Sequence, residues 1–368
     1  MLAKANPGID ERIKSEPFMT RLMKRPELGA IGGVILVTIF FMITADSAMF
    51  TLSGIMNFMT PAAQLGILGI AAAMLMIGGE FDLSIGSMVA FAGMIFGVFT
   101  VNVGLPLIFA IPLTLAFAAS IGAVNGMIVI RTGLPSFIVT LASLFILRGA
   151  SLVGLKLFTD GSTQLRGVRD AVENDFLTPI FSGEAFGFVF RKLADIGVLE
   201  TFKSGLPKVP GVPVEILWFI AFALVATYIL LRTSAGNWIF ATGGDSNAAQ
   251  NSGVPVRRVK ISLFMVTAMA AALVAIITVI DAGSTDARRG FMKEFEAIIT
   301  AVIGGCLLTG GYGSAIGAFF GAIIFGMVTI GLTYTDFDQD WFQVFLGGML
   351  LIAVVFNNAI RKRVTGER

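Results

Sequence analysis

Long runs without a charged residue alternate with short charged segments along the chain. A helix needs about 20 apolar residues to cross the hydrocarbon core of a bilayer, and several of these runs reach or approach that length. Single membrane-spanning helices are predicted at 29–45, 54–78, 86–103, 105–130, 132–155, 216–231, 261–280 and 341–360. The run at 297–335 is long enough for two more, broken at the GGYGS sequence of 310–314. The pattern therefore predicts an all-α polytopic membrane protein with about ten transmembrane helices.

The polar segments between and beyond these runs set the predicted orientation. Basic residues gather at 1–28, 232–260 and 361–368, namely Lys14, Arg21, Lys24, Arg25, Arg232, Arg257, Arg258, Lys260, Arg361, Lys362 and Arg363. Such residues favour the cytoplasmic side, and an even number of spans puts all three segments there. We therefore expect cytoplasmic termini, a cytoplasmic loop at 232–260, a periplasmic insert at 158–213 and a transmembrane domain at 29–360. Arg288, Arg289 and Lys293 would then lie outside, flanked by acidic residues.

Composition agrees with a membrane protein and excludes several classes of function. Hydrophobic residues make up 56% of the 368 residues and charged residues 14%, which is too apolar for a soluble domain. A net charge of +2 provides no field for nucleic acid. The lack of histidine and the single Cys306 exclude the usual zinc and His-based catalytic sites. No P-loop sequence GxxxxGK[ST] is present, so we expect no enzyme and no cofactor in this chain, with any ATP and Mg on a partner.

Two carboxylates, Glu80 and Asp82, stand between two long apolar runs in the sequence IGGEFDLSIGS (77–87). A carboxylate is costly at membrane depth unless it is paired, hydrated or interfacial. One interpretation is that Asp82 or Ser84 caps the helix that begins near Ser84. The other is that these residues belong to a pathway or gate, and both can hold. A similar sequence, IGGCLLTGGYGS (303–314), recurs later, which we interpret as a local similarity.

Other polar residues inside the predicted spans are candidates for a polar path. Arg148 lies in the fifth span and must face protein, water or the interface. The amides of Asn57 and Asn125 would suit a hydroxylated solute. Each alone is more often an interhelical hydrogen bond.

The loop GNWIFATGGDSNAAQNSGVPVRRVK (236–260) is the most distinctive cytoplasmic segment. Asp245 fits the N-cap of a short helix that ends near Gly253. Small residues on a brief helix between two spans suit docking into a groove on a partner, whereas an ordinary connecting loop is the alternative. The candidate docking residues are Gly243, Gly244, Asp245, Asn247, Ala248, Ala249 and Gly253.

At these residues the chain resembles the ribose-type permeases of ATP-binding-cassette importers, the branch serving monosaccharides such as ribose, xylose, galactose and inositol. GGEFDLSIGSMVAFAGM (78–94) is similar to the family's first signature, with Glu80 and Phe81 where a single apolar residue is usual. The segment 241–260 resembles the cytoplasmic coupling loop, with Asp245 where asparagine is common. The segment 290–326 resembles a third signature that includes Glu294.

The resemblance implies a permease subunit of the bacterial inner membrane that forms the pathway for a monosaccharide or polyol. The implied partners are a second permease copy or paralogue, a cytoplasmic ATPase that docks at 241–254, and a periplasmic sugar-binding protein. Glu294 then joins Asn57, Glu80, Asp82, Ser84, Asn125 and Arg148 as a pathway or gate candidate. An ion-coupled secondary transporter is the alternative, although such proteins bury several ionisable residues in their spans and few are present here.

Overall fold

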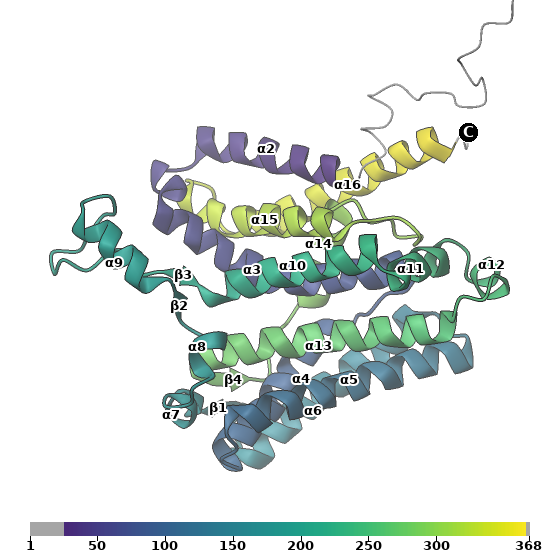
Figure 1. The fold of residues 1–368 in the computed structure, drawn as a ribbon, viewed down its shortest axis with the longest axis horizontal. Helices are drawn as coiled ribbons and strands as arrows, with labels where there is room; N and C mark the ends of the chain where they lie inside the picture. Colours follow the sequence, from purple (N-terminus) through teal and green to yellow (C-terminus); the bar gives the residue numbers. More distant parts are fainter. Residues whose placement is uncertain (1–25, 366–368) are drawn as a thin grey trace, which may run out of the picture.

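The computed structural model describes residues 26–365, with side-chain surroundings for residues 27–355. Regular structure is almost entirely helical, and the only strands in the described part form two short antiparallel pairs (Figure 1). The protein is therefore an all-α polytopic membrane protein, as its apolar runs predicted. Residues 1–25 and 366–368 lie outside the described residues. The cytoplasmic orientation of both termini stays a prediction, because the length and composition of the helices do not give their direction through the membrane.

Within the described residues, eight helices are long and apolar enough to cross a membrane. They coincide with predicted spans and comprise α2 (Pro26–Thr44), α3 (Leu52–Ile77), α4 (Ile85–Gly97) with the π-helical turn Val98–Asn102, α5 (Leu107–Thr132), α6 (Ser136–Phe158), α10 (Val214–Arg232), α13 (Val256–Ala282) and α15 (Ala315–Gly331) with the 3₁₀ turn Leu332–Tyr334. The helix α16 (Trp341–Thr365) covers the last predicted span.

The prediction of two full spans within 297–335 was wrong. The first of them is α14 (Lys293–Ile303), which has 11 residues. At 1.5 Å per residue it is about 16 Å long and cannot cross a hydrocarbon core of about 30 Å. The predicted break at 310–314 does separate α14 from α15, but Gly304 and Gly305 end α14 early. An apolar run does not distinguish a membrane span from a half-length helix buried in protein.

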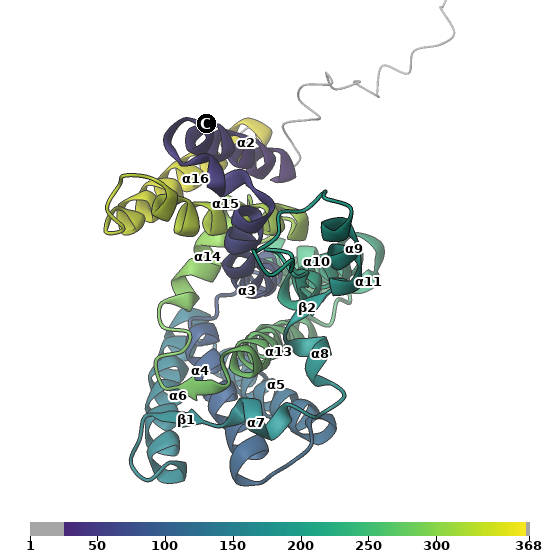
Figure 2. The same cartoon turned by 90° about the vertical axis from the view of Figure 1, so that its left-hand side faces the viewer.

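The helix α3 lies at the centre of the bundle. Of its most apolar 18-residue stretch, 83% is buried, the largest share among the eight candidate spans. It packs against α10, α13, α14 and α15. Figure 2 shows α4, α5, α6 and α13 on one side of it and α2, α15 and α16 on the other. The outer helices carry exposed apolar side chains such as Ile43 and Leu224, which suit contact with lipid.

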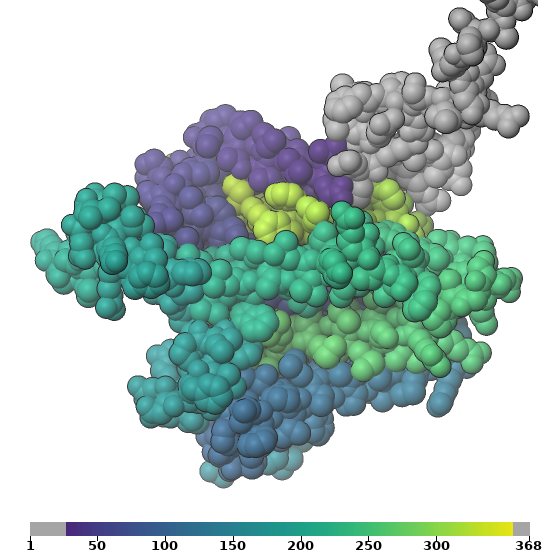
Figure 3. All heavy atoms as spheres, viewed as in Figure 1, coloured from purple at the N-terminus to yellow at the C-terminus, as the bar shows by residue number. Residues whose placement is uncertain are grey.

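Short elements project from the two ends of the bundle. At one end, the segment between α6 and α10 holds β1 (Gln164–Arg166), α7 (Val168–Val172), α8 (Thr178–Phe181), β2 (Glu184–Ala185), α9 (Gly187–Asp195) and β3 (Val212–Pro213). The strand β1 pairs with β4 (Ser284–Asp286) of the α13–α14 connection, and β2 pairs with β3. At the other end lie α11 (Ser234–Gly244) and α12 (Ser246–Asn251). Figure 3 shows α9 and the chain around it standing out from the first end.

The two similar glycine-pair sequences end their helices in the same way. The amides of Gly78, Gly79 and Glu80 donate to the carbonyls four, three and five residues earlier, and the amides of Gly304, Gly305 and Cys306 repeat this pattern. Gly79 and Gly305 both have positive φ, 84° and 90°. This is a Schellman-type end, which satisfies the last helix carbonyls and turns the chain sharply. The local sequence similarity thus corresponds to one shared backbone structure.

Close contact between α14 and α15 depends on glycine, because a Cβ on Gly317 would lie 1.9 Å from the carbonyl oxygen of Gly304. We expect Gly317→Ala to destabilise the protein by about 1–3 kcal/mol through overpacking. The measurement is the thermal unfolding midpoint of the purified protein in mild detergent. Gly347→Ala in α16 is the matched control, because nothing lies within 4 Å of the added Cβ. Equal midpoints for the two variants would contradict this packing.

Candidate functional site

A buried polar network joins three of the predicted site residues. The Asp82 carboxylate accepts hydrogen bonds from the Ser84 backbone N–H at 2.8 Å and from the Ser84 hydroxyl at 2.6 Å. Its second oxygen accepts from the Thr267 hydroxyl at 2.8 Å. The Asn125 amide donates to Ser84 Oγ at 3.2 Å and accepts from the Ser143 hydroxyl at 2.6 Å. Side chains from α5, α6 and α13 thus converge on the turn between α3 and α4.

The turn at 78–84 breaks the helical path, so its backbone amides need other partners. The α6 hydroxyls of Ser136 and Thr140 supply two of them, accepting from the Phe81 and Leu83 amides at 3.0 Å each. Asp82 supplies a third by accepting from Ser84.

The prediction that Asp82 or Ser84 caps α4 was wrong: Ser84 is the N-cap residue, but no described side chain accepts from the first-turn amides of α4. Asp82 instead stabilises the turn before the helix by accepting from the Ser84 amide. A role for Asp82 in a pathway or gate stays a prediction.

A charged pair lies where the N-terminal ends of α4 and α14 meet. Arg148 of α6 approaches Glu294 Oε1 at 3.5 Å and lies over the Phe291 ring, 5.0 Å from its centroid. The Glu294 side chain is 2% exposed and its Oε2 atom has no hydrogen-bond partner. That oxygen lies beside Gly86 in the first turn of α4. The Arg148 side chain is 31% exposed, so in a bilayer it must face water or another protein surface.

The two remaining candidates lie apart from this network. Glu80 forms an ion pair with Lys260, near the start of α13. Asn57 is exposed and donates to the Tyr334 hydroxyl at 3.1 Å.

Four hydroxyl-bearing residues around Asp82 and Asn125 were not predicted from the sequence, namely Thr267, Ser143, Ser136 and Thr140. The spacing of the three α6 hydroxyls at 136, 140 and 143 places them on one helix face and could have indicated a polar stripe.

The predicted docking residues form a capped helix at the far end of the bundle. Asp245 caps α12 by accepting from the Asn247 and Ala248 amides at 2.9 and 3.0 Å. Gly253 follows with a φ of 86°. In α12, Asn247 and Ala248 are exposed while Ala249 is buried. Gly244 has open space beside it, whereas a Cβ on Gly243 would lie 1.8 Å from the Ile77 carbonyl oxygen.

Comparisons with known proteins identify the family of the chain. The family described as "Branched-chain amino acid transport system / permease component" matches residues 54–354. The xylose transport system permease protein of Escherichia coli (strain K12) is 28% identical, covering 90% of this chain and 92% of the relative. The ribose import permease protein of the same organism is 29% identical, covering 92% and 94%. That of Haemophilus influenzae is 29% identical, covering 88% and 90%. No solved structure matches the chain.

The family match covers most of the chain, including the buried network and the α11–α12 segment. The chain belongs to this permease family. It is a ribose-type permease subunit of an ATP-binding-cassette importer, as its motifs predicted, and a multi-pass protein of the inner membrane. The subunit is not catalytic, because ATP hydrolysis resides on a separate subunit.

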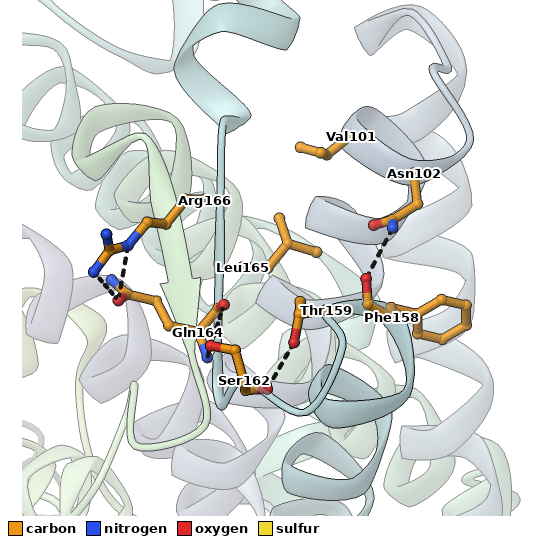
Figure 4. A pocket seen from close by; sticks show the side chains of 8 residues that line it. All are labelled: Val101, Asn102, Phe158, Thr159, Ser162, Gln164, Leu165 and Arg166. Atoms are coloured by element: carbon orange, nitrogen blue, oxygen red, sulfur yellow. Dashed lines mark hydrogen bonds between the residues drawn. The ribbon is translucent and has the colours of Figure 1, made fainter.

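Two cavities at the end of the permease opposite α12 were not predicted. One is an open recess of about 390 Å³ between the ends of α4 and α6 and strand β1. Its polar groups bond to one another: Asn102 donates to the Phe158 carbonyl at 3.0 Å, and Arg166 donates to Gln164 Oε1 (Figure 4). Gln164 and Arg166 turn toward each other, away from Asn102. The recess therefore has no converging set of free polar groups.

The other cavity, of about 300 Å³, lies between α3, α10 and α13 and is lined by the carboxylates Glu184, Glu215 and Asp281. Burial raises the pKa of the Glu184 carboxyl group above its usual value, and the nearby charge of Asp281 raises it further.

These three carboxylates do not form a metal site. Within the described part of the permease, no group of three or more Cys, Asp or Glu residues is placed to hold a metal ion.

Removing one hydroxyl from the network should destabilise the permease. Thr267→Val keeps the shape of the side chain but deprives the buried Asp82 of a donor, at a cost of about 1–3 kcal/mol. Thr278→Val on the same helix is the matched control, because the Thr278 hydroxyl bonds only to carbonyls of α13 itself. Thermal unfolding in mild detergent compares the two. A midpoint for Thr267→Val no lower than that for Thr278→Val would contradict the role of Thr267.

Proposed function

We propose that this permease forms the translocation pathway for a monosaccharide or related polyol, which a periplasmic binding protein delivers and a separate ATPase drives across the membrane. The observation that carries the proposal is the similarity over about nine tenths of the chain to permeases named for xylose and ribose. The composition of the buried network also supports it. The groups that bond to the Asn125 amide are the hydroxyls of Ser84 and Ser143, which are neutral like the hydroxyls of a sugar.

We place the solute path along the face where Arg148 of α6 reaches toward Glu294 of α14. Arg148 presents about a third of its side chain there, and its guanidinium lies over the exposed ring of Phe291. A guanidinium can donate to several hydroxyl oxygens, and aromatic rings can pack against the apolar face of a sugar. Asp82, Ser84 and Asn125 would act behind this surface by holding the broken segment in place.

The same face gives a reason for a second permease subunit. A partly exposed arginine within a span is unfavourable against lipid, and a second copy or paralogue across from α6 and α14 would enclose it in a hydrated pathway. Both possibilities for the second subunit stay open. The Glu294 carboxylate behind Arg148 limits how far that guanidinium can move, so its position would be set before the solute arrives.

We assign the segment 241–254 to docking on the ATPase. The exposed residues Asn247, Ala248 and Gln250 of α12 would enter a groove on that subunit. Ala249 is buried against the permease and would transmit the movement inward. The capping carboxylate of Asp245 keeps this short helix ordered before it docks.

Reconstitution into liposomes tests the proposal. The permease is combined with the ATPase and binding protein that co-purify with it from native membranes, and uptake of a panel of radiolabelled monosaccharides and polyols is measured. We expect uptake of at least one member to require ATP and the binding protein. Uptake by the permease alone, driven by an ion gradient without ATP, would instead support a secondary transporter.

The docking assignment predicts different results for two substitutions of Asp245. Asp245→Asn keeps an N-cap, whereas Asp245→Ala removes it at a cost of about 1 kcal/mol to a helix of only 6 residues. We therefore expect Asp245→Ala to lower the amount of ATPase that co-purifies with the permease and Asp245→Asn to retain it. Equal recovery of the ATPase with both variants would count against the capped helix as the docking element.

A further inference from the structure

We propose that the ion pair between Glu80 and Lys260 is a positioning pair, which transmits movement of the ATPase-docking segment to the buried Asp82 network. Lys260 Nζ lies 2.5 Å from Glu80 Oε1. The inference rests on the proposed function, because it concerns how the permease responds to an ATPase. Neither residue touches the solute in this account.

The pair is shielded from solvent. The side chains of Lys260 and Glu80 are 18% and 10% exposed, in contrast to the surface pair of Lys208 and Glu200, which are 48% and 74% exposed. Exposed ion pairs contribute little because water and salt screen them, whereas a shielded pair holds its two backbones together more strongly. The Glu80–Lys260 contact can therefore carry a displacement from one segment to the other.

The turn that contains Glu80 is also in backbone contact with α11, the helix that leads into the docking helix α12. Gly79, next to Glu80, approaches Gly243 at the end of α11, where an added Cβ would lie 3.3 Å from the Gly243 Cα. The Gly311 amide donates to the Ile77 carbonyl at 2.9 Å. Because glycine backbone meets glycine backbone there, movement of the end of α11 would press directly on the turn that contains Glu80.

The helix α13 holds this turn at two points. Lys260 binds Glu80, and Thr267, seven residues later on the same face of the helix, binds Asp82. α12 leads into α13 through a short connection after Asn251. A shift of α13 that follows α12 would therefore move Glu80 and Asp82 together and change the position of the α4 N-terminus, which lies beside Glu294.

The test uses the complete complex of permease, ATPase and binding protein in liposomes and measures the solute molecules taken up per ATP hydrolysed. We expect Glu80→Gln and Lys260→Met each to lower this coupling ratio by about tenfold, within the range of typical coupling energies. The double variant should be no worse than either single one. The charge-reversed pair, Glu80→Lys with Lys260→Glu, should recover most of the ratio, which loss of folding would not allow.

Glu200→Gln with Lys208→Met serves as the matched control, because it removes an exposed ion pair from the segment between α6 and α10. Co-purified ATPase should stay at the unaltered level in all variants. A coupling ratio for Glu80→Gln within about twofold of the unaltered complex, or additive losses in the double variant, would overturn the inference. Absence of ATP-dependent uptake by the unaltered complex would overturn the proposed function itself.

Discussion

The structure depends on one constraint: backbone that leaves a helix inside an apolar bundle must still satisfy its amides and carbonyls. Two glycine pairs, at Gly78–Gly79 and Gly304–Gly305, end α3 and α14 with the same hydrogen-bond pattern. After the first pair, the backbone amides at 81, 83 and 84 have no helical partner. Hydroxyls of α6 and the carboxylate of Asp82 accept hydrogen bonds from them. Without these partners, an irregular segment at 79–84 would be too costly to bury.

The helix α4 begins just after the first of these breaks, beside a buried charged group. The N-terminal ends of α4 and α14 approach each other, and Glu294 lies between Gly86 and Arg148. The same broken segment that is held by Asp82 touches Gly243 at the end of α11. We propose that in this permease one structural feature serves two purposes: it positions polar side chains beside the solute path, and it connects that path to the surface where the ATPase would dock.

Local patterns allowed much of the fold to be predicted, while contacts between distant segments could not be. The charge-free runs located the long helices, and the spacing of Asp245 and Gly253 located α12, because capping involves only neighbouring residues. The half-length α14 was missed, since burial in protein and burial in lipid select the same apolar residues. The partners of Asp82 and Glu80, namely Thr267 and Lys260, lie about 180 residues away in the chain and became evident only in the structure.

We propose that the solute path follows the face of α6 that carries Arg148. Labelling of single cysteines with a membrane-impermeant maleimide in the complete complex tests it most directly, after the buried native Cys306 is replaced. A cysteine at position 148 should react, and added solute should slow the reaction. A cysteine at position 146, where Ile146 is exposed on another side of the same helix, should not react. Equal labelling of both positions, or no effect of solute at position 148, would contradict the account.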